Sequence, residues 1–415
     1  MAEVAVIGAG AVGVACALAC QEAGLATLLI DPVPIAASEA AASFGNAGGI
    51  TVSAVVPMAT PATLRAVPRM LRDPLAPLSI RWRDLPALAP WLARFALNAR
   101  PHRLAQVHAA LRTLFADSGD AWRRLAQRVP GVSSHLHWDG ILYAYRSEAA
   151  FRAAAPAHAM RRTAGFGVRD LDGAGVAARV PGLAPMQGGV LIPECGHVDD
   201  PAAVVRLMHA RFLALGGARC VARVRAVAAA ATGVAIHLDD GTQLVAPQAV
   251  LAAGIRGGAL ARGAGLRLPL TAERGYHAML PEPGLTLPLQ LMDGDGSYAL
   301  TSMREGLRLA GTVELAAPDA PPDWRRAQIL VEQASRLLPG LNTQGATFWM
   351  GRRPSLPDGL PAIGRAPRLP ALVCALGHGH NGLTLAALTG EIVARLLRHR
   401  DPGLDLAPFD PARFA

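Results

Sequence analysis

The feature that most constrains the fold is a glycine motif near the start of the chain. Gly8-Ala9-Gly10-Ala11-Val12-Gly13 follows the apolar run 4–7 and opens an alanine-rich segment that stops at Gly24, and a second apolar run then ends at Asp31. In this strand–helix–strand order the glycines permit a tight turn, the helix N-terminus faces a pyrophosphate, and the acid accepts hydrogen bonds from a ribose. The pattern predicts a dinucleotide-binding α/β unit. The residues expected to contact the dinucleotide are Gly8, Gly10, Ala11, Val12, Gly13 and Asp31.

The bulk composition indicates a folded protein with more than one domain. The chain has 415 residues, of which 52% are hydrophobic and 17% charged, and its formal net charge is +9. A chain of this length is too long for one small core. The positive charge suits an acidic substrate or an anionic membrane face. Nucleic acid is not expected as a partner, because no basic segment is interleaved with aromatic residues.

Cysteine usage and hydropathy bear on location. The five cysteines form no Cys-x-x-Cys motif and no metal-ligand spacing with histidine, so a reducing cytoplasm and no metal site are expected. The uncharged stretches are broken by Gly, Pro or polar residues, which predicts no continuous membrane span. Segment 57–103 mixes Trp and other apolar side chains with arginines such as Arg81, Arg83 and Arg94. It is interpreted either as a contact with the inner face of the cytoplasmic membrane or as a helical lid over the substrate.

The remaining pattern predicts two interleaved domains. One helix is expected over 105–128, a strand over 218–224, a β-rich stretch over 270–313, and a turn at 377–382 that opens a last helix over 383–398. The fold class is therefore α/β, with a discontinuous Rossmann-like nucleotide domain and a mixed α+β substrate domain that carries an antiparallel sheet. The expected segments are 1–58, 198–264 and 351–415 for the nucleotide domain, and 59–197, with a helical insertion, and 265–350 for the substrate domain.

Six motifs in this order resemble the FAD-dependent D-amino acid oxidase/dehydrogenase superfamily, and bacterial D-amino acid dehydrogenases in particular. They are the N-terminal glycine motif with Asp31, Ser43-x-x-Asn46-Ala47-Gly48, and the segments 196–201, 251–254, 351–361 and 377–384. The resemblance implies FAD as cofactor and an amino acid as substrate. It also implies hydride transfer from Cα of a D-amino acid to flavin N5, giving an imino acid that hydrolyses to a 2-oxo acid and ammonia.

The resemblance extends the set of expected cofactor contacts. The backbone donors of 377–382 would meet the electron-rich N1–C2=O edge of the flavin. The further contacts are Ser43, Asn46, Ala47, Gly48, Val224, Ala253, Gly254, Gly377, His378, Gly379, His380, Asn381, Gly382, Leu383 and Thr384.

Arg353 is the leading candidate for binding the substrate. The superfamily holds the substrate carboxylate with the arginine of an Arg-Pro pair, and Arg353 matches it, since a planar guanidinium makes a bidentate clamp. The alternatives are that Arg353 pairs with a structural carboxylate such as Asp358, or that the neighbouring Arg352 points inward. Three further candidates for the catalytic pocket are Tyr298, Tyr276 and His277, the last of which could instead face solvent on a strand.

The electron acceptor implied by the resemblance is a quinone or another non-oxygen acceptor. Three alternatives stay open: a D-proline or hydroxyproline dehydrogenase, a glycine- or sarcosine-type oxidase that uses O₂, and a flavoprotein subunit of a hetero-oligomer.

Overall fold

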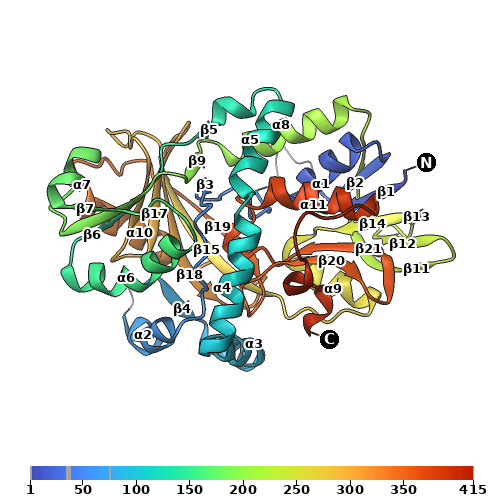
Figure 1. The fold of residues 1–415 in the computed structure, drawn as a ribbon, viewed down its shortest axis with the longest axis horizontal. Helices are drawn as coiled ribbons and strands as arrows, with labels where there is room; N and C mark the ends of the chain where they lie inside the picture. Colours follow the sequence, from blue (N-terminus) through green and yellow to red (C-terminus); the bar gives the residue numbers. More distant parts are fainter. Residues whose placement is uncertain (1, 34–38, 74–75, 415) are drawn as a thin grey trace.

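The computed structural model describes residues 2–33, 39–73 and 76–414. One end of the molecule is built on a six-stranded sheet (Figure 1). The strand order is β10-β2-β1-β14-β21-β20. All neighbours are parallel except β20, which runs antiparallel to β21. The bounds are Val4–Ile7 for β1, Thr27–Asp31 for β2, Ala218–Val221 for β10, Gln248–Leu251 for β14, Ala362–Ala366 for β20 and Leu369–Leu376 for β21.

Successive residues of these strands face two different layers, as the period of two in a strand requires. Val4 and Val6 pack with three helices, α1, α8 and α11, in one hydrophobic cluster, while Ala5 and Ile7 pack with α9 and a three-stranded sheet on the other face. The bounds are Ala11–Glu22 for α1, Pro201–Ala214 for α8, Ala386–Leu397 for α11, Gly257–Ala261 for α9, Val224–Ala230 for β11, Gly233–Leu238 for β12 and Gln243–Ala246 for β13. The α/β fold class predicted from the sequence is confirmed.

The other end of the molecule carries a nine-stranded, largely antiparallel sheet (Figure 1). Its order is β19-β15-β18-β17-β16-β6-β8-β7, with β4 also paired to β18. The bounds are Leu78–Ile80 for β4, Ile141–Tyr145 for β6, Arg169–Asp172 for β7, Gly188–Ile192 for β8, Thr271–Leu280 for β15, Gln290–Asp293 for β16, Tyr298–Met303 for β17, Gly306–Leu315 for β18 and Thr347–Ser355 for β19. Helix α10 (Arg325–Leu337) packs on this sheet through Leu330, Ala334 and Leu337.

The remaining elements connect or cover the two sheets. The helices are α2 Pro61–Arg72, α3 Leu85–Asn98, α4 Pro101–Phe115, α5 Ser118–Arg128, α6 Glu148–Thr163 and α7 Gly173–Arg179. A small sheet joins β3 (Gly49–Ile50), β9 (Gly196–Val198) and β5 (Leu136–His137) in the order β3-β9-β5. The 3₁₀ turns are Trp82–Asp84, Val132–His135, Gly254–Arg256, Arg262–Ala264, Gly379–Asn381, Ala407–Phe409 and Pro411–Phe414. We retain the domain boundaries expected from the sequence as a proposed division.

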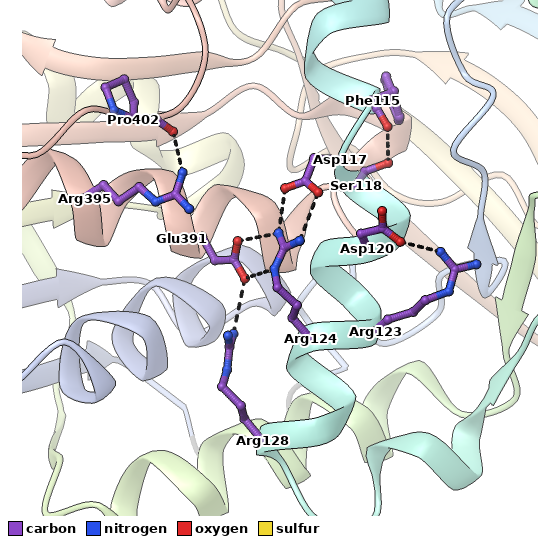
Figure 2. A network of polar contacts seen from close by, with 10 residues as sticks. All are labelled: Phe115, Asp117, Ser118, Asp120, Arg123, Arg124, Arg128, Glu391, Arg395 and Pro402. Atoms are coloured by element: carbon purple, nitrogen blue, oxygen red, sulfur yellow. Dashed lines mark hydrogen bonds and ion pairs between the residues drawn. The ribbon is translucent and has the colours of Figure 1, made fainter. Parts of the chain in front are cut away.

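Helix α5 is clamped to α11, the helix that follows the 377–382 turn. Arg124 bonds Asp117 at 2.6 Å and Glu391 at 2.7 Å, and Figure 2 shows its guanidinium between the two carboxylates. On the same helix the indole of Trp122 donates to the carbonyl oxygen of Thr384 at 3.0 Å. Charge-assisted bonds of this kind are stronger than neutral ones. Two helices far apart in the chain thus fix the position of the 377–382 turn.

Three local expectations differ from the structure. The helix expected over 105–128 is two helices, because α4 ends at Phe115 and α5 begins at Ser118. The Ser118 hydroxyl donates a hydrogen bond to the Phe115 carbonyl oxygen across this interruption. The strand expected over 218–224 ends at Val221, and β11 begins a separate sheet at Val224. The last helix begins at 386, so the 377–382 turn does not open it directly.

In the described part of the chain, no helix combines the length and apolar character needed to cross a membrane.

Burial lowers the pKa of five buried histidines, His209 and the four below, and we expect them to make stability depend on pH. Burial lowers the pKa of His158, His197 and His378 to about 4 and that of His277 to about 3, from an ordinary 6.5. Between these values the unfolded chain binds protons that the native chain does not, so the free energy of unfolding should fall as the pH is lowered from about 6.5 to about 4. Each histidine contributes at most about 1.4 kcal/mol per pH unit.

His158→Gln tests this expectation, because Nε2 of His158 lies 2.8 Å from the Tyr145 hydroxyl and a glutamine amide can replace that bond. Urea unfolding at several pH values should give a shallower dependence in the variant than in the parent protein. Identical slopes would contradict the assignment.

Candidate active site

The N-terminal glycine turn has a geometry that only glycine tolerates. Gly8 has a φ of 104°, and a Cβ on it would lie 2.6 Å from Ala252 O. A Cβ on Gly13 would overlap the carbonyl oxygen of Gly8. At Gly10, in contrast, the nearest atom to such a Cβ is Ser43 Oγ at 3.8 Å. The turn is therefore packed against the sheet on one side and open at Gly10.

The start of helix α1 is suited to an anion. Its N-cap, Gly10, provides no side-chain cap, and its first turn has no acidic residue. The backbone N–H groups and the positive end of the helix dipole therefore face the open side of the turn. Asp31 lies next to them, because its carboxylate accepts hydrogen bonds from the backbone N–H of Ala9 at 2.8 Å and of Val33 at 3.1 Å. An anion-binding helix end beside a fixed carboxylate fits a pyrophosphate and its ribose.

A cavity of about 1320 Å³ extends from this turn to the nine-stranded sheet. It exceeds the roughly 300–1000 Å³ of an ordinary small-molecule site, so it has room for a dinucleotide and a small substrate together. The cofactor residues expected from the sequence that line it are Gly8, Gly10, Ala11, Val12, Asp31, Ser43, Asn46, Ala47, Val224, Ala253, Gly254, Gly377, His378, Gly379, His380, Asn381, Gly382, Leu383 and Thr384. Gly13 and Gly48 are not in the lining. Gly13 packs against Gly8, and a Cβ on Gly48 (φ 78°) would clash with Val198 O.

The second glycine turn joins the two sheets. Gly377 and Gly379 have φ values of 76° and 52°, and His378 forms an isolated β-bridge with Ser355 at the end of β19. His380 Nε2 lies 2.6 Å from Oε2 of the buried Glu273 on β15. Burial alone would raise the pKa of Glu273, but His380, Ser355 and Arg353 together hold it below its ordinary value. Glu273 is therefore ionised at neutral pH and fixes the His380 ring against the cavity.

Arg353 lies on β19 over a gap made by a glycine. Its register partner on β15 is Glu273, and a Cβ on Gly275, two residues further along, would overlap the Arg353 guanidinium. The guanidinium donates to the carbonyl of Thr312 at 3.3 Å. Burial lowers the pKa of Arg353, and the nearby Glu273 partly offsets this. Among the described residues, no carboxylate lies within ion-pair distance of it.

Asp358 and Arg352, the residues named in the two alternative interpretations, both have other partners. Asp358 pairs with Arg413 at 2.8 Å and not with Arg353, and the structural carboxylate that acts on Arg353 is Glu273, which partly offsets the effect of burial on its pKa. Arg352 also reaches the cavity wall, but it donates to Pro318 O and lies 3.7 Å from the exposed Asp319.

Thr312 is a part of the site that sequence reasoning did not identify. The β15–β18 register shifts between Arg274 and Tyr276, so Gly275 faces an extra residue on β18. Thr312 there has a φ of 51°, a genuine outlier for a β-branched residue. This bulge turns the Thr312 carbonyl toward Arg353. No local sequence signal marks this bulge. The glycines at 275 and 351, which pair across β15 and β19, can in contrast be recognised in the sequence.

Of the three second-tier candidates, Tyr276 and His277 have hydrogen-bond partners elsewhere, whereas the buried Tyr298 hydroxyl has none among the described residues. The Tyr276 ring lines the cavity, but its hydroxyl donates to Glu314 at 2.6 Å and accepts from the backbone of Asp323. Tyr298 also lines the cavity, and burial, followed by Asp293, raises the pKa of its hydroxyl. His277 is absent from the lining and is only 5% exposed, so it faces neither the pocket nor solvent. His277 lies next to the loop that contains Gly45, with its Nδ1 atom 3.0 Å from the Gly45 carbonyl oxygen.

A parallel sheet built from separate chain segments and two glycine turns along one cavity, with a half-buried arginine at its far wall, indicate a dinucleotide-dependent oxidoreductase. The chain belongs to the DAO family, described as FAD dependent oxidoreductase, whose family model matches residues 3–396. It is therefore an enzyme, and its cofactor is FAD, for which the α1 N-terminus and the Asp31 carboxylate have the required chemistry.

Two curated relatives match along nearly their full length. The chain is 38% identical over 421 residues to a D-amino-acid oxidase of Bradyrhizobium diazoefficiens, with 99% of each chain covered. It is 31% identical over 427 residues to a D-amino acid dehydrogenase of Paramagnetospirillum magneticum, again with 99% of each covered.

Two solved structures share the fold. Glycine oxidase from Geobacillus kaustophilus has a TM-score of 0.75 and 21% identity, over 99% of this chain and 98% of that one. L-proline dehydrogenase from P. horikoshii has a TM-score of 0.74 and 17% identity, over 100% of this chain and 97% of that one.

Proposed function

We propose that this enzyme oxidises D-amino acids at the Cα–N bond, giving an imino acid that hydrolyses to a 2-oxo acid and ammonia. The observation that carries the proposal is the Arg353 guanidinium, which lies half-buried in the cavity wall with no ion-pair partner among the described residues, although the buried Glu273 lies nearby. Glu273 offsets the desolvation of this guanidinium only in part, so a substrate carboxylate that bonds it directly would be bound strongly there. The preference for D substrates is supported by the names of the two curated relatives.

The chain's own residues would bind and orient the substrate. Arg353 holds the carboxylate, and the bond to Thr312 together with the space at Gly275 fixes the direction of the guanidinium. Bound FAD supplies the two-electron acceptor. The 377–382 turn presents backbone donors at the cavity, and neutral His378 adds no charge there. The role of these residues is positioning, which for a well-aligned pair of reactants lowers the barrier substantially.

For the second half-reaction we propose a quinone or another non-oxygen acceptor. An oxidase that uses O₂ is the second candidate, and the name of the relative at 38% identity favours it. The anaerobic titration below separates the two.

Contact with a membrane surface would suit a quinone acceptor, and we propose it for the region around Trp82. Trp82 is 63% exposed, and the adjacent Arg83 side chain is 70% exposed. Arg83 lies 3.8 Å from Asp84 but remains exposed, whereas Arg81 pairs with the buried Glu314 at 3.3 Å and its side chain is only 22% exposed. Trp82→Ala with Arg83→Glu should abolish sedimentation with vesicles of anionic lipid. Equal sedimentation of the variant and the parent protein would reject the contact.

The direct test is an anaerobic titration of the purified holoenzyme with D- and L-amino acids, followed at the visible flavin band. Bleaching by D- but not L-amino acids is expected, with slow recovery in air and fast recovery with a quinone or dye. Fast recovery in air would establish the oxidase instead. Bleaching by glycine or D-proline alone would move the function to those substrates. Bleaching that needs a partner protein would indicate a subunit of a hetero-oligomer.

A further inference from the structure

The loop of residues 45–47 is held to the nine-stranded sheet by its carbonyl groups. Arg308 of β18 donates to the Asn46 carbonyl oxygen at 2.7 Å. Three neighbouring strands provide the other side chains, which are Gln290 and Thr301, both donors to the Ala47 carbonyl oxygen, and His277, whose Nδ1 lies 3.0 Å from that of Gly45. In a trans peptide the C=O and N–H groups point in opposite directions. The N–H groups of these peptides therefore point away from the sheet.

The N–H group of Ala47 is available to a ligand. Ala47 lines the cavity, and its N–H makes no hydrogen bond to any residue that the structure describes. The next N–H along the chain, that of Gly48, is already bonded to Oδ1 of Asn46 at 2.8 Å. A backbone donor without a partner in a cavity wall is suited to an electronegative atom of a bound molecule.

Arg308, which holds the other side of the Asn46–Ala47 peptide, is a buried cation. It is only 7% exposed, and none of the ion pairs within residues 2–33, 39–73 and 76–414 includes it. Burial lowers the pKa of Arg308 to about 10, against the effect of Asp200 and Glu305, so the guanidinium stays charged at neutral pH. A charge in such surroundings is poorly screened, and it polarises the peptide group that it bonds.

This loop lies at the end of the cavity where the reacting part of FAD belongs. The pyrophosphate is expected at the N-terminus of α1, on the parallel sheet. Residues 45–47 lie instead on the nine-stranded sheet, which also carries Arg353. The rings of His277 and Trp349, on β15 and β19 beside the loop, stack with centroids 5.1 Å apart. The flavin ring must reach the substrate, so it would lie along this loop.

We propose that Arg308 raises the reduction potential of bound FAD by polarising the Asn46–Ala47 peptide, whose N–H donates to the flavin. A donor backed by a positive charge stabilises a group that gains electrons more than the same group before it gains them. Arg308 acts through the peptide and is a positioning residue. The inference concerns the cofactor and not the substrate, so it extends beyond the proposed oxidation of D-amino acids.

Arg308→Met tests the proposal through the two-electron midpoint potential of the holoenzyme, measured without substrate by anaerobic equilibration with reference dyes. Reduced FAD should be held about 10- to 100-fold less tightly relative to oxidised FAD, which lowers the potential by about 30–60 mV. Arg308→Lys keeps the charge and should recover most of this loss. An unchanged potential in Arg308→Met would overturn the proposal.

Two control variants separate the charge from the position of the loop. Thr301→Val removes a bond to the Ala47 carbonyl, but the N–H of that peptide belongs to Gly48 and is bonded to Asn46. Arg365→Met removes an arginine that donates to two backbone carbonyls away from the cavity. Each control should keep the ratio of the two FAD affinities within about twofold, or about 10 mV. A shift in either control as large as that in Arg308→Met would reject the role of the charge.

Titration of the apoproteins with oxidised FAD completes the test. Arg308→Met should keep its affinity for oxidised FAD within about threefold of the parent protein, because the loss is expected in the reduced form. Equal weakening of both forms would show that Arg308 only holds the loop, and would overturn the proposal. Should Arg308→Met fail to fold, Arg308→Gln keeps an uncharged donor and should still lower the potential. An unshifted potential in Arg308→Gln would then reject the inference.

Discussion

Replacing Arg353 with methionine is expected to lower kcat/KM for a D-amino acid by about 30- to 5000-fold, because loss of one partner of a buried charge pair costs about 2–5 kcal/mol. Methionine keeps much of the side-chain length over Gly275, so the sheet should be retained. Arg353→Lys keeps the charge but loses the bidentate geometry and should fall in between. The measurement is steady-state kinetics with a dye acceptor, together with the FAD content of each variant.

The matched control is Arg352→Met, one residue earlier on the same strand. Arg352 pairs with an Asp319 side chain that is 78% exposed, and an exposed ion pair contributes up to about 1 kcal/mol. This variant should remain within about fivefold of the parent enzyme. Equal losses in both variants would show that the strand, and not the Arg353 guanidinium, was disturbed. A larger loss from Arg352→Met would make Arg352 the inward clamp.

The second large effect is expected from Gly13→Ala, which should weaken FAD binding by at least about 100-fold or prevent its retention. In an ordinary helix interior, alanine is favoured over glycine by about 1 kcal/mol. Here its Cβ would overlap the Gly8 carbonyl, and relief requires the glycine turn or α1 to shift. The turn carries the cofactor-facing N–H groups, so a small shift should be felt at FAD. Titration of the apoprotein with FAD measures the effect.

Gly340→Ala is the control for this substitution. A Cβ on Gly340 has no heavy atom within 4 Å, so the same chemical change should leave the FAD affinity unaltered. Far-UV circular dichroism of the apoproteins separates a binding defect from a folding defect. Full FAD occupancy in Gly13→Ala would show that the turn can move without cost.

The parts of the site that could be predicted are those encoded locally. The first glycine turn follows from strand, turn, helix and acid within the first residues, and the structure brings Gly8, Gly10 and Asp31 to one cavity. Strand β19 was not expected, because Arg352, Arg353 and Pro354 hide its alternation. It is an edge strand of the nine-stranded sheet, with β15 as its neighbour, and an edge strand tolerates a proline.

What could not be predicted depends on residues far apart in the chain. The direction of the Tyr276 hydroxyl is set by Glu314 and Asp323, which reach it from β18 and from the segment before α10. The His277 ring is oriented by the carbonyl of Gly45, which comes 232 residues earlier in the chain. Periodicity indicates which residues are buried, but it does not show which long-range partner takes each polar group.

The position of β21 in the sheet sets the order in which the enzyme can mature. This strand lies beside β14, and the turn that follows it lines the cavity, yet both come after every strand of the nine-stranded sheet in the chain. Pairing of distant strands is slow because a long loop must close first. During synthesis the second sheet can assemble while the parallel sheet still lacks its inner strand. The cavity lining is therefore complete only once the chain has been made through the 377–382 turn, and the full stabilisation that bound FAD gives is available only from that point.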